Sequence, residues 1–141
     1  MNDKYFLDTN IFVYAFDKTD PAKQQTANLL IKTAVFEQTG CISYQVMQEF
    51  INVVTRKFAV PMTITDCQKY LDAVLAPLNT VFTSIELYHR ALDIMERWQF
   101  AFYDALIIAG ALQAQCNILY TEDMQHGQKI EFLQITNPFL G

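Results

Sequence analysis

Short apolar runs alternate along the chain with longer segments whose apolar residues have helical spacing. The first run, Tyr5–Leu7, contains no alternating polar residue, which is typical of a strand buried on both faces of a parallel sheet. Other strand-length runs follow at residues 40–43, 80–83, 118–121 and, with a weaker pattern, 132–135. The pattern therefore predicts five strands.

Two of the intervening segments begin with clear helix start signals. Asp20 and Pro21 suit the N-cap and the first position of a helix over residues 22–36. Ser43, at the end of the second predicted strand, is placed to cap a helix over residues 44–58.

Three more helices are predicted downstream. Thr65 and Gln68 resemble a capping box for a helix over 66–75, and Pro77 is expected to stop that helix. The remaining two helices are predicted at 85–98 and 103–115. The last of them is apolar nearly all round, so we expect it to be the most buried helix.

Strands that alternate with helices are typical of an open parallel sheet with helices on both faces. We therefore predict an α/β fold of three layers, α/β/α, around a parallel five-stranded sheet. The length of 141 residues, the 52% apolar content and the lack of a Gly-, Ser- or Pro-rich linker predict a single domain over residues 1–141. In such sheets, sites form beyond the carboxyl ends of the strands, where the strand order reverses.

Neither a membrane span nor an export signal is expected. The longest strongly apolar run, residues 105–112, is far shorter than the roughly 20 residues that cross a bilayer. Residues 1–4 lack the basic and then apolar pattern of a signal peptide. We expect a cytoplasmic protein, and we predict reduced structural thiols, rather than zinc ligands, at the three cysteines Cys41, Cys67 and Cys116.

Four acidic residues lie where a purely structural role for a charge is hard to find. Asp8 follows the first predicted strand and Asp123 the fourth, Asp104 opens the most apolar helix, and Glu49 lies on or beside the apolar stripe of its helix. Buried charges are costly unless they are paired or bind a metal ion. Because the predicted topology brings all four acids to one end of the sheet, we predict one divalent-cation site.

Each acid also has a structural alternative when taken alone. Asp8 suits a turn or an N-cap, and Asp104 suits the favourable dipole position in the first turn of a helix. Glu49 could reach solvent or pair with Arg56, and Asp123 could belong to a simple turn. The joint occurrence of the four acids at one end of the sheet favours the metal site over these alternatives.

Asp123 is preferred over its neighbour Glu122 as the ligand. Thr121 and Asp123 share one side of an extended chain, and Glu122 points to the other side. An oxygen-only ligand set without His or Cys selects a hard ion, Mg²⁺ or Mn²⁺. The formal net charge of −5 disfavours a nucleic-acid partner, but metal ions that neutralise these acids would leave basic side chains free to line a groove.

Four short motifs containing these acids follow one another along the chain. They are Phe6-Leu7-Asp8-Thr9-Asn10, Gln48-Glu49-Phe50, Phe102-Tyr103-Asp104-Ala105-Leu106-Ile107 and Leu119-Tyr120-Thr121-Glu122-Asp123-Met124. In this order they resemble the motifs of PIN domains. Among PIN domains, the chain is most similar to the small VapC-type ribonuclease toxins of bacterial toxin–antitoxin modules, and the resemblance covers essentially the whole chain.

The resemblance implies a metal-dependent endoribonuclease that uses Mg²⁺ or Mn²⁺ at a site of Asp8, Glu49, Asp104 and Asp123. It further implies an RNA substrate, a small antitoxin as partner and a homodimer. Supporting polar roles are implied for Thr9, Asn10 and Thr121. Many relatives continue after the last Asp with a basic residue and Phe, whereas Met124-Gln125-His126-Gly127 follows here, so the RNA target stays open.

The predicted function is therefore hydrolysis of RNA phosphodiester bonds by the toxin of a toxin–antitoxin pair. Two alternatives stay open: a housekeeping RNA-processing PIN nuclease, and a non-catalytic PIN-like module that binds RNA or protein. The candidate RNA contacts are Tyr14, Arg56 and Lys57. The early apolar residues Ile11, Phe12 and Phe16 are predicted to pack in the core in preference to forming a docking surface for a partner.

Overall fold

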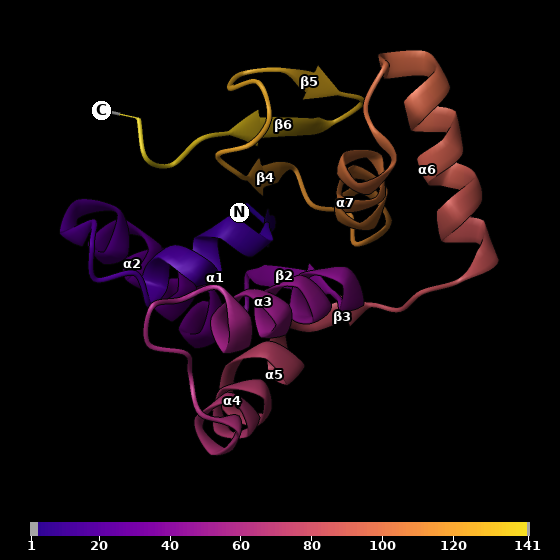
Figure 1. The fold of residues 1–141 in the computed structure, drawn as a ribbon. Helices are drawn as coiled ribbons and strands as arrows, with labels where there is room; N and C mark the ends of the chain where they lie inside the picture. Colours follow the sequence, from indigo (N-terminus) through magenta and orange to yellow (C-terminus); the bar gives the residue numbers. More distant parts are fainter. Residues whose placement is uncertain (1–2, 141) are drawn as a thin grey trace.

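The centre of the molecule is a six-stranded sheet with the strand order β3-β2-β1-β4-β6-β5 (Figure 1). The computed structural model describes residues 3–140. The strands are β1 (Tyr5–Leu7), β2 (Gly40–Ser43), β3 (Asn79–Val81), β4 (Ile118–Tyr120), β5 (Lys129–Ile130) and β6 (Leu133–Thr136). All neighbouring pairs are parallel except β5 and β6, which are antiparallel. The α/β class and five parallel strands are thus confirmed, whereas the predicted total of five strands missed the short edge strand β5.

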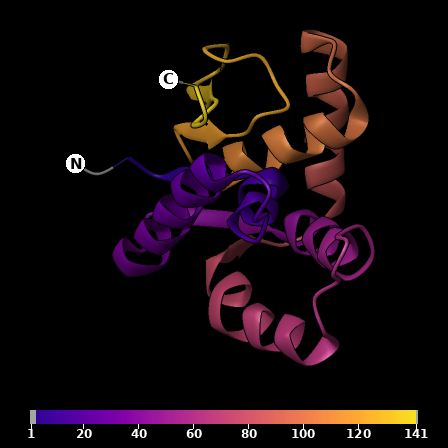
Figure 2. The same cartoon turned by 60° about the vertical axis from the view of Figure 1, so that its left-hand side comes forward.

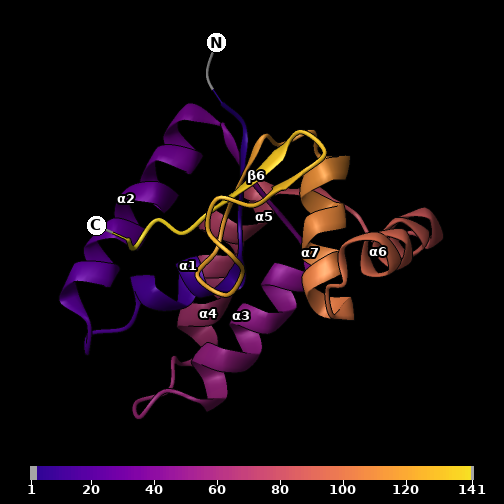
Figure 3. The ribbon, with the colours of Figure 1, turned by 90° about the horizontal axis from the view of Figure 1, so that it is seen from above.

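Helices cover both faces of this sheet. Figure 3 shows α2 on one side of the sheet and α6 and α7 on the other. The helices are α1 (Thr9–Ala15), α2 (Pro21–Glu37), α3 (Tyr44–Arg56), α4 (Ile64–Tyr70), the π-helical turn η1 (Leu71–Leu75), α5 (Ala76–Leu78), α6 (Ile85–Trp98) and α7 (Phe102–Gln113). Within residues 3–140, no helix combines the length and the apolar character that crossing a membrane requires.

The segment from α4 to α5 differs most from its prediction. Thr63, rather than Thr65, caps α4, because the Thr63 side chain accepts a hydrogen bond from the backbone N–H of Asp66. Pro77 does not stop the helix, which continues through α5 to Leu78. The π-helical turn η1 immediately precedes this proline, and such a widened turn relieves the clash between a proline ring and the preceding turn of helix. Figure 2 shows this segment below the sheet. Its side chains Cys67, Leu75 and Leu78 are buried in the core.

Ser43 precedes α3 as predicted, but its side chain forms no capping hydrogen bond. Its hydroxyl oxygen is buried and has no hydrogen-bond partner within the described residues. The Ser43 side chain instead lies close to Gly110 of α7, where a Cβ atom added to the glycine would approach Ser43 Cβ to 3.8 Å. Packing between β2 and α7 therefore takes precedence over the predicted cap.

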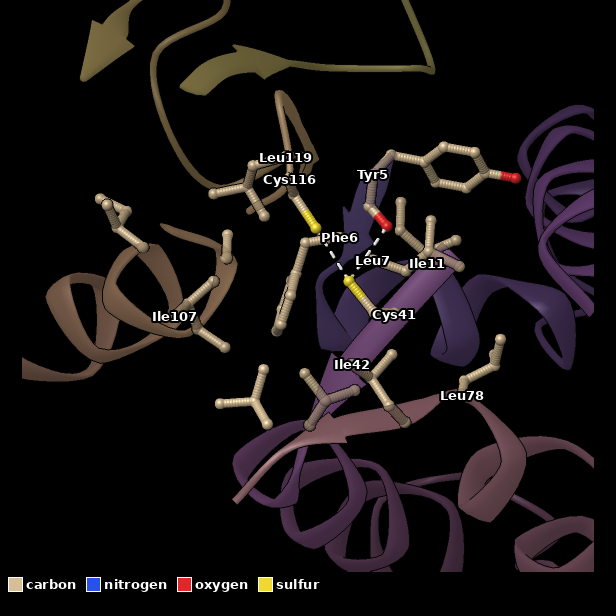
Figure 4. Close-up of a cluster of buried hydrophobic side chains, with 14 of the residues drawn as sticks. Tyr5, Phe6, Leu7, Ile11, Cys41, Ile42, Leu78, Ile107, Cys116 and Leu119 are labelled. Atoms are coloured by element: carbon tan, nitrogen blue, oxygen red, sulfur yellow. Dashed lines mark hydrogen bonds between the residues drawn. The ribbon is translucent and has the colours of Figure 1, made fainter. Parts of the chain in front are cut away.

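Figure 4 shows part of the core, in which buried side chains of β1, β2 and α7 lie together with Leu119 of β4. Seven residues of α7 are buried, so its prediction as the most buried helix is confirmed: Ala105, Ile107, Ile108, Ala109, Gly110, Ala111 and Leu112. Ile11 and Phe12 are fully buried, which confirms core packing for both. The three cysteines are buried free thiols, and the sulfur atoms of Cys41 and Cys116 approach each other to 2.8 Å.

Candidate functional site

The four predicted acids lie around one edge of the sheet, at the carboxyl ends of its central strands. Asp8 directly follows β1, and Asp123 lies three residues beyond the end of β4. Glu49 is on α3, the helix that starts where β2 ends, and Asp104 is in the first turn of α7. Because β1, β2 and β4 are adjacent and parallel, their carboxyl ends meet at this edge.

Asp8 is held in a buried position, with only 6% of the residue exposed. One carboxylate oxygen, Oδ1, accepts a hydrogen bond from the backbone N–H of Thr9 at 2.7 Å, and Oδ2 accepts one from the hydroxyl of Thr121 at 2.8 Å. Asp8 is therefore also the N-cap of α1, so its structural alternative holds together with its place in the acidic cluster.

The environment of Asp8 disfavours its charge. The pKa of Asp8 is raised to about 7. Burial is the largest cause and the charges of Glu49 and Asp123 act in the same direction, whereas the hydrogen bonds from Thr121 and Thr9 lower the pKa. Removal from water therefore outweighs two favourable hydrogen bonds. Such a carboxylate is stabilised by an added positive charge.

Glu49 is connected to Asp8 through Thr9. The Thr9 hydroxyl donates to Glu49 Oε1 at 2.6 Å, and the amide of Gln45 lies 3.4 Å from Glu49 Oε2. The same Gln45 amide donates to the backbone oxygen of Tyr103 at 3.1 Å, which ties α3 to the start of α7. Glu49 therefore points into the cluster, and the pair with Arg56 is not formed.

Asp123 is exposed and is oriented by Asn10. The Asn10 amide donates to Asp123 Oδ2 at 3.0 Å and to the hydroxyl oxygen of Thr121 at 3.2 Å. The backbone N–H of Asp123 also donates to this hydroxyl oxygen, at 3.1 Å. The fully buried Thr121 hydroxyl thus joins Asp8, Asn10 and Asp123 in one network.

Asp104 lies near these acids but forms no hydrogen bond with them. It is partly buried, and burial raises its pKa, followed by the charges of Asp123 and Glu49. No Lys or Arg within residues 3–140 forms an ion pair with Asp8, Glu49, Asp104 or Asp123. The negative charge of the four acids is therefore not compensated by protein side chains.

The donor chemistry of this cluster fits a hard divalent ion. All four acids offer oxygen atoms, and the burial of Asp8 makes an added cation favourable. The side chains do not form a closed cage, since within residues 3–140 no three His, Cys, Asp or Glu side chains converge as metal ligands would. Thr9, Asn10 and Thr121 instead hold the carboxylates individually, as mutually repelling charges require.

A cleft of about 640 Å³ opens beside the cluster. Glu49 and Asp123 line it together with Thr9 and Asn10, whereas Asp8 and Asp104 lie outside its lining. Most of the remaining lining comes from α1, α3 and the end of β4, and these residues are Val13, Tyr14, Asp17, Asn52, Val53, Lys57 and Glu122.

The sequence analysis missed a second polar network at this cleft. Glu122 points away from Asp8, forms an ion pair with Lys23 of α2 and accepts a hydrogen bond from the Tyr14 hydroxyl at 2.5 Å. The ammonium group of Lys23 lies 4.7 Å from the centre of the Tyr14 ring. Since Lys23 and Glu122 are 99 residues apart, no local sequence pattern indicates their contact.

Comparisons with known proteins agree with this fold. The model of one protein family, described as the PIN domain, matches residues 5–129. The fold resembles a toxin–antitoxin complex from Klebsiella pneumoniae, with 18% identity, a TM-score of 0.68 and coverage of 96% of this chain and 98% of that chain. It also resembles VapBC2 from Rickettsia felis bound to a promoter DNA fragment, with 23% identity, a TM-score of 0.60 and coverage of 94% and 97%.

A third similar structure is VapC20 of Mycobacterium tuberculosis, described as a Sarcin-Ricin loop cleaving toxin. The identity is 16%, the TM-score is 0.62, and the alignment covers 85% of this chain and 92% of that chain. No curated protein sequence matches the chain. At these identities the structural likeness shows the fold alone.

Proposed function

Because the chain belongs to the PIN domain family, whose model matches residues 5–129, we propose that it is a metal-dependent endoribonuclease. We further propose that it hydrolyses RNA phosphodiester bonds as the toxin of a toxin–antitoxin pair. The observation that carries the proposal is the cluster of uncompensated acids, linked through Thr9, Asn10 and Thr121, at the edge of an open cleft. Burial disfavours the charge of Asp8 and neighbouring carboxylates repel one another, so the cluster costs stability that a bound cation would restore.

Asp8, Asp104 and Asp123 would hold Mg²⁺ or Mn²⁺, and Glu49 would complete the ligand set. When bound, the ion supplies Lewis-acid chemistry, which activates water and offsets the charge that develops on the scissile phosphate.

The neighbouring polar side chains orient these acids. The Thr121 hydroxyl and the Thr9 backbone N–H fix the two oxygens of Asp8, the Thr9 hydroxyl fixes Glu49, and the Asn10 amide fixes Asp123. Glu49 and Asp123 line the cleft, which supports a role for either carboxylate as the acceptor of the proton of the attacking water.

The proposed role as a toxin implies a protein partner. Two of the similar structures are a toxin–antitoxin complex and a VapBC2 complex on promoter DNA, and we propose that this chain likewise pairs with a small antitoxin. We also propose that it forms a homodimer and acts in the cytoplasm. A short open reading frame that encodes a DNA-binding fold immediately upstream would favour the toxin over a housekeeping nuclease, and co-purification of its product with this chain tests the pairing.

The decisive experiment is cleavage of defined RNAs by the purified chain. A panel that includes a transfer RNA, a sarcin–ricin-loop oligonucleotide and unstructured RNA is incubated with Mg²⁺ or Mn²⁺, with and without a chelator. We expect internal cuts that the chelator abolishes. Glu86→Gln, which changes an exposed acid on α6, serves as the matched control and should cut like the native chain. Intact RNA under all metal conditions, or equal cleavage with the chelator present, would contradict the proposal.

A further inference from the structure

Three neighbouring cavities extend from the acidic cleft to aromatic side chains near the end of α1, the end of α3 and α4. The cleft shares Asp17 and Lys57 with a neighbouring cavity of about 520 Å³. That cavity shares Phe16, Phe58 and Val60 with a third cavity of about 310 Å³. The second and third cavities, called the side groove below, therefore adjoin the cleft that is lined by Glu49 and Asp123.

The part of the side groove nearest the acids is positively charged. Lys57 and Lys18 line it, both are exposed, and neither forms an ion pair within residues 3–140. The nearby Asp17 is engaged by Thr19, whose hydroxyl and backbone N–H both donate to one of its oxygens. Unpaired lysines that line a groove are suited to the phosphates of a nucleic-acid backbone.

The far part of the side groove is aromatic. Phe16 and Tyr70 pack edge to face against each other, with ring centres 4.9 Å apart. Phe58 pairs with no other aromatic ring among the described residues, and the adjacent Val60 is 84% exposed. A volume of about 310 Å³ lies within the range of small-molecule pockets, and a flat nucleobase is a ligand of that class.

Resting on the proposed function, we propose that the side groove binds the single-stranded RNA next to the cleavage site. A backbone phosphate lies on Lys57, and the adjacent nucleobase stacks against Phe58. Alternation of cations with aromatic rings is the usual way in which proteins hold single-stranded RNA, because every base has a stacking face. Asp66 at the rim of the pocket repels phosphate and can accept an N–H group of a base, so it favours the base at this end over the backbone.

We favour RNA over an apolar protein segment as the occupant because the side groove lies next to the acidic cleft. The side groove adjoins the cleft that contains Glu49 and Asp123, and Lys57 lines both the cleft and the groove. An RNA strand that is cut at the acids extends from the cleft on its 5′ side and on its 3′ side. One of these two sides can follow the side groove past Lys57. The groove therefore extends the proposed substrate site and determines which base is accepted beside the cut.

Binding of short fluorescent single-stranded RNA oligonucleotides, measured by anisotropy with a chelator present so that no cleavage occurs, tests the proposal. Lys57→Gln should weaken binding several-fold and lower the slope of log affinity against log salt by about 1. Lys32→Gln makes the same charge change on an exposed side chain of α2 that lines none of the three cavities, and this variant should bind like the native chain.

The aromatic part is tested by two substitutions of Phe58. Phe58→Leu keeps an apolar side chain but removes the ring, and we expect about tenfold weaker binding with an unchanged salt slope. Phe58→Tyr retains the ring and should bind like the native chain. Thermal unfolding of each variant checks that the fold persists, and Phe36→Ala, at a side chain 80% exposed on α2, controls for the loss of a surface ring.

The outcomes separate this inference from the proposed function. If the native chain cleaves RNA with Mn²⁺ and both Phe58→Leu and Lys57→Gln bind and cut RNA normally, the inference is wrong and the nuclease proposal stands. The groove then fits an apolar segment of a protein partner instead. If the native chain neither binds nor cuts any RNA, both the nuclease proposal and this inference are wrong.

Discussion

Asp8 and Glu122 are acids at the same edge of the sheet, but their surroundings shift their pKa values in opposite directions. Glu122 is partly buried, which disfavours its charge, but the hydrogen bonds from Lys23 and Tyr14 and the charge of Lys23 outweigh burial and lower its pKa. Asp8 receives hydrogen bonds only from neutral groups, and burial raises its pKa to about 7.

The difference distinguishes a carboxylate that the protein compensates with its own cation from one that it leaves uncompensated. The protein compensates Glu122 with its own cation, so this carboxylate needs no ligand. Asp8, Glu49, Asp104 and Asp123 have no such partner among residues 3–140, although Lys23 and Lys57 lie at the same end of the molecule. Acids that a fold leaves uncompensated in this way are candidates for binding an external cation.

The largest expected effect is on RNA cleavage, which should depend on the uncompensated acids and hardly on the compensated Glu122. Asp104→Asn should lower metal-dependent RNA cleavage by more than about a hundredfold, because it removes a charged ligand while leaving the helix intact. Glu122→Gln should change cleavage by no more than a few-fold. Rates of RNA cleavage under single-turnover conditions provide the measurement. Similar losses in both variants would contradict the distinction between the uncompensated acids and Glu122.

The next largest effect is on stability. In the folded chain Asp8 keeps its proton up to a pH of about 7, whereas its ordinary pKa is 3.8, so the metal-free protein loses stability as pH rises between these values. Asparagine cannot ionise. Asp8→Asn should therefore be more stable than the native chain at pH 8, by about 4 kcal/mol, and hardly more stable at pH 4. Urea unfolding in chelator at both pH values measures this, and an equal difference at both would contradict it.

Smaller effects on stability and Mn²⁺ binding are expected from a change at Thr121, whose hydroxyl joins Asp8 and Asn10 in one network. Thr121→Val keeps the shape of the side chain but removes the hydroxyl that donates to Asp8 and accepts from Asn10. We expect a loss of stability of about 1 kcal/mol and Mn²⁺ binding weakened about tenfold, as for other groups that orient metal ligands. Chemical unfolding and Mn²⁺ titration report the two effects. Thr136→Val, at a half-buried residue of β6, is the control.

The smallest effect is expected from the compensated acid itself. The Lys23 and Glu122 side chains are 31% and 26% exposed, and ion pairs in partial contact with water contribute little to stability. Glu122→Gln should lower the melting temperature only slightly and leave Mn²⁺ binding intact. A large loss of Mn²⁺ affinity would show that Glu122 belongs to the metal site after all.

Much of the fold follows from local patterns. Helix α6 and strands β1 and β2 have the predicted bounds, because capping residues and buried apolar runs act over a few residues. Strand β5 was missed because a strand of two residues is too short to show an apolar run or an alternation of apolar and polar residues. The continuation of the helix through Pro77 was missed because the adjustment occurs in the preceding turn, at η1.

The acids of the candidate site could be selected from sequence, since Asp8, Asp104 and Asp123 follow or open an apolar element. Glu49 was selected because it lies on or beside the apolar stripe of its helix. Their hydrogen-bond partners could not be derived in this way. The contact between Asn10 and Asp123 spans 113 residues, and that between Lys23 and Glu122 spans 99. Contacts of this kind depend on how β1, β4 and α2 are placed together, and this placement is a property of the whole fold.

Calorimetric titration with Mn²⁺ tests the central claim most directly, namely that the uncompensated acids bind a hard divalent cation. At pH 8 the native chain and Glu122→Gln should show saturable binding, whereas Asp8→Asn and Asp104→Asn should show little or none. Binding should also release more protons as the pH is lowered toward 7, because the ion displaces the proton of Asp8. Absence of binding to the native chain, or equal binding by all four proteins, would contradict the account.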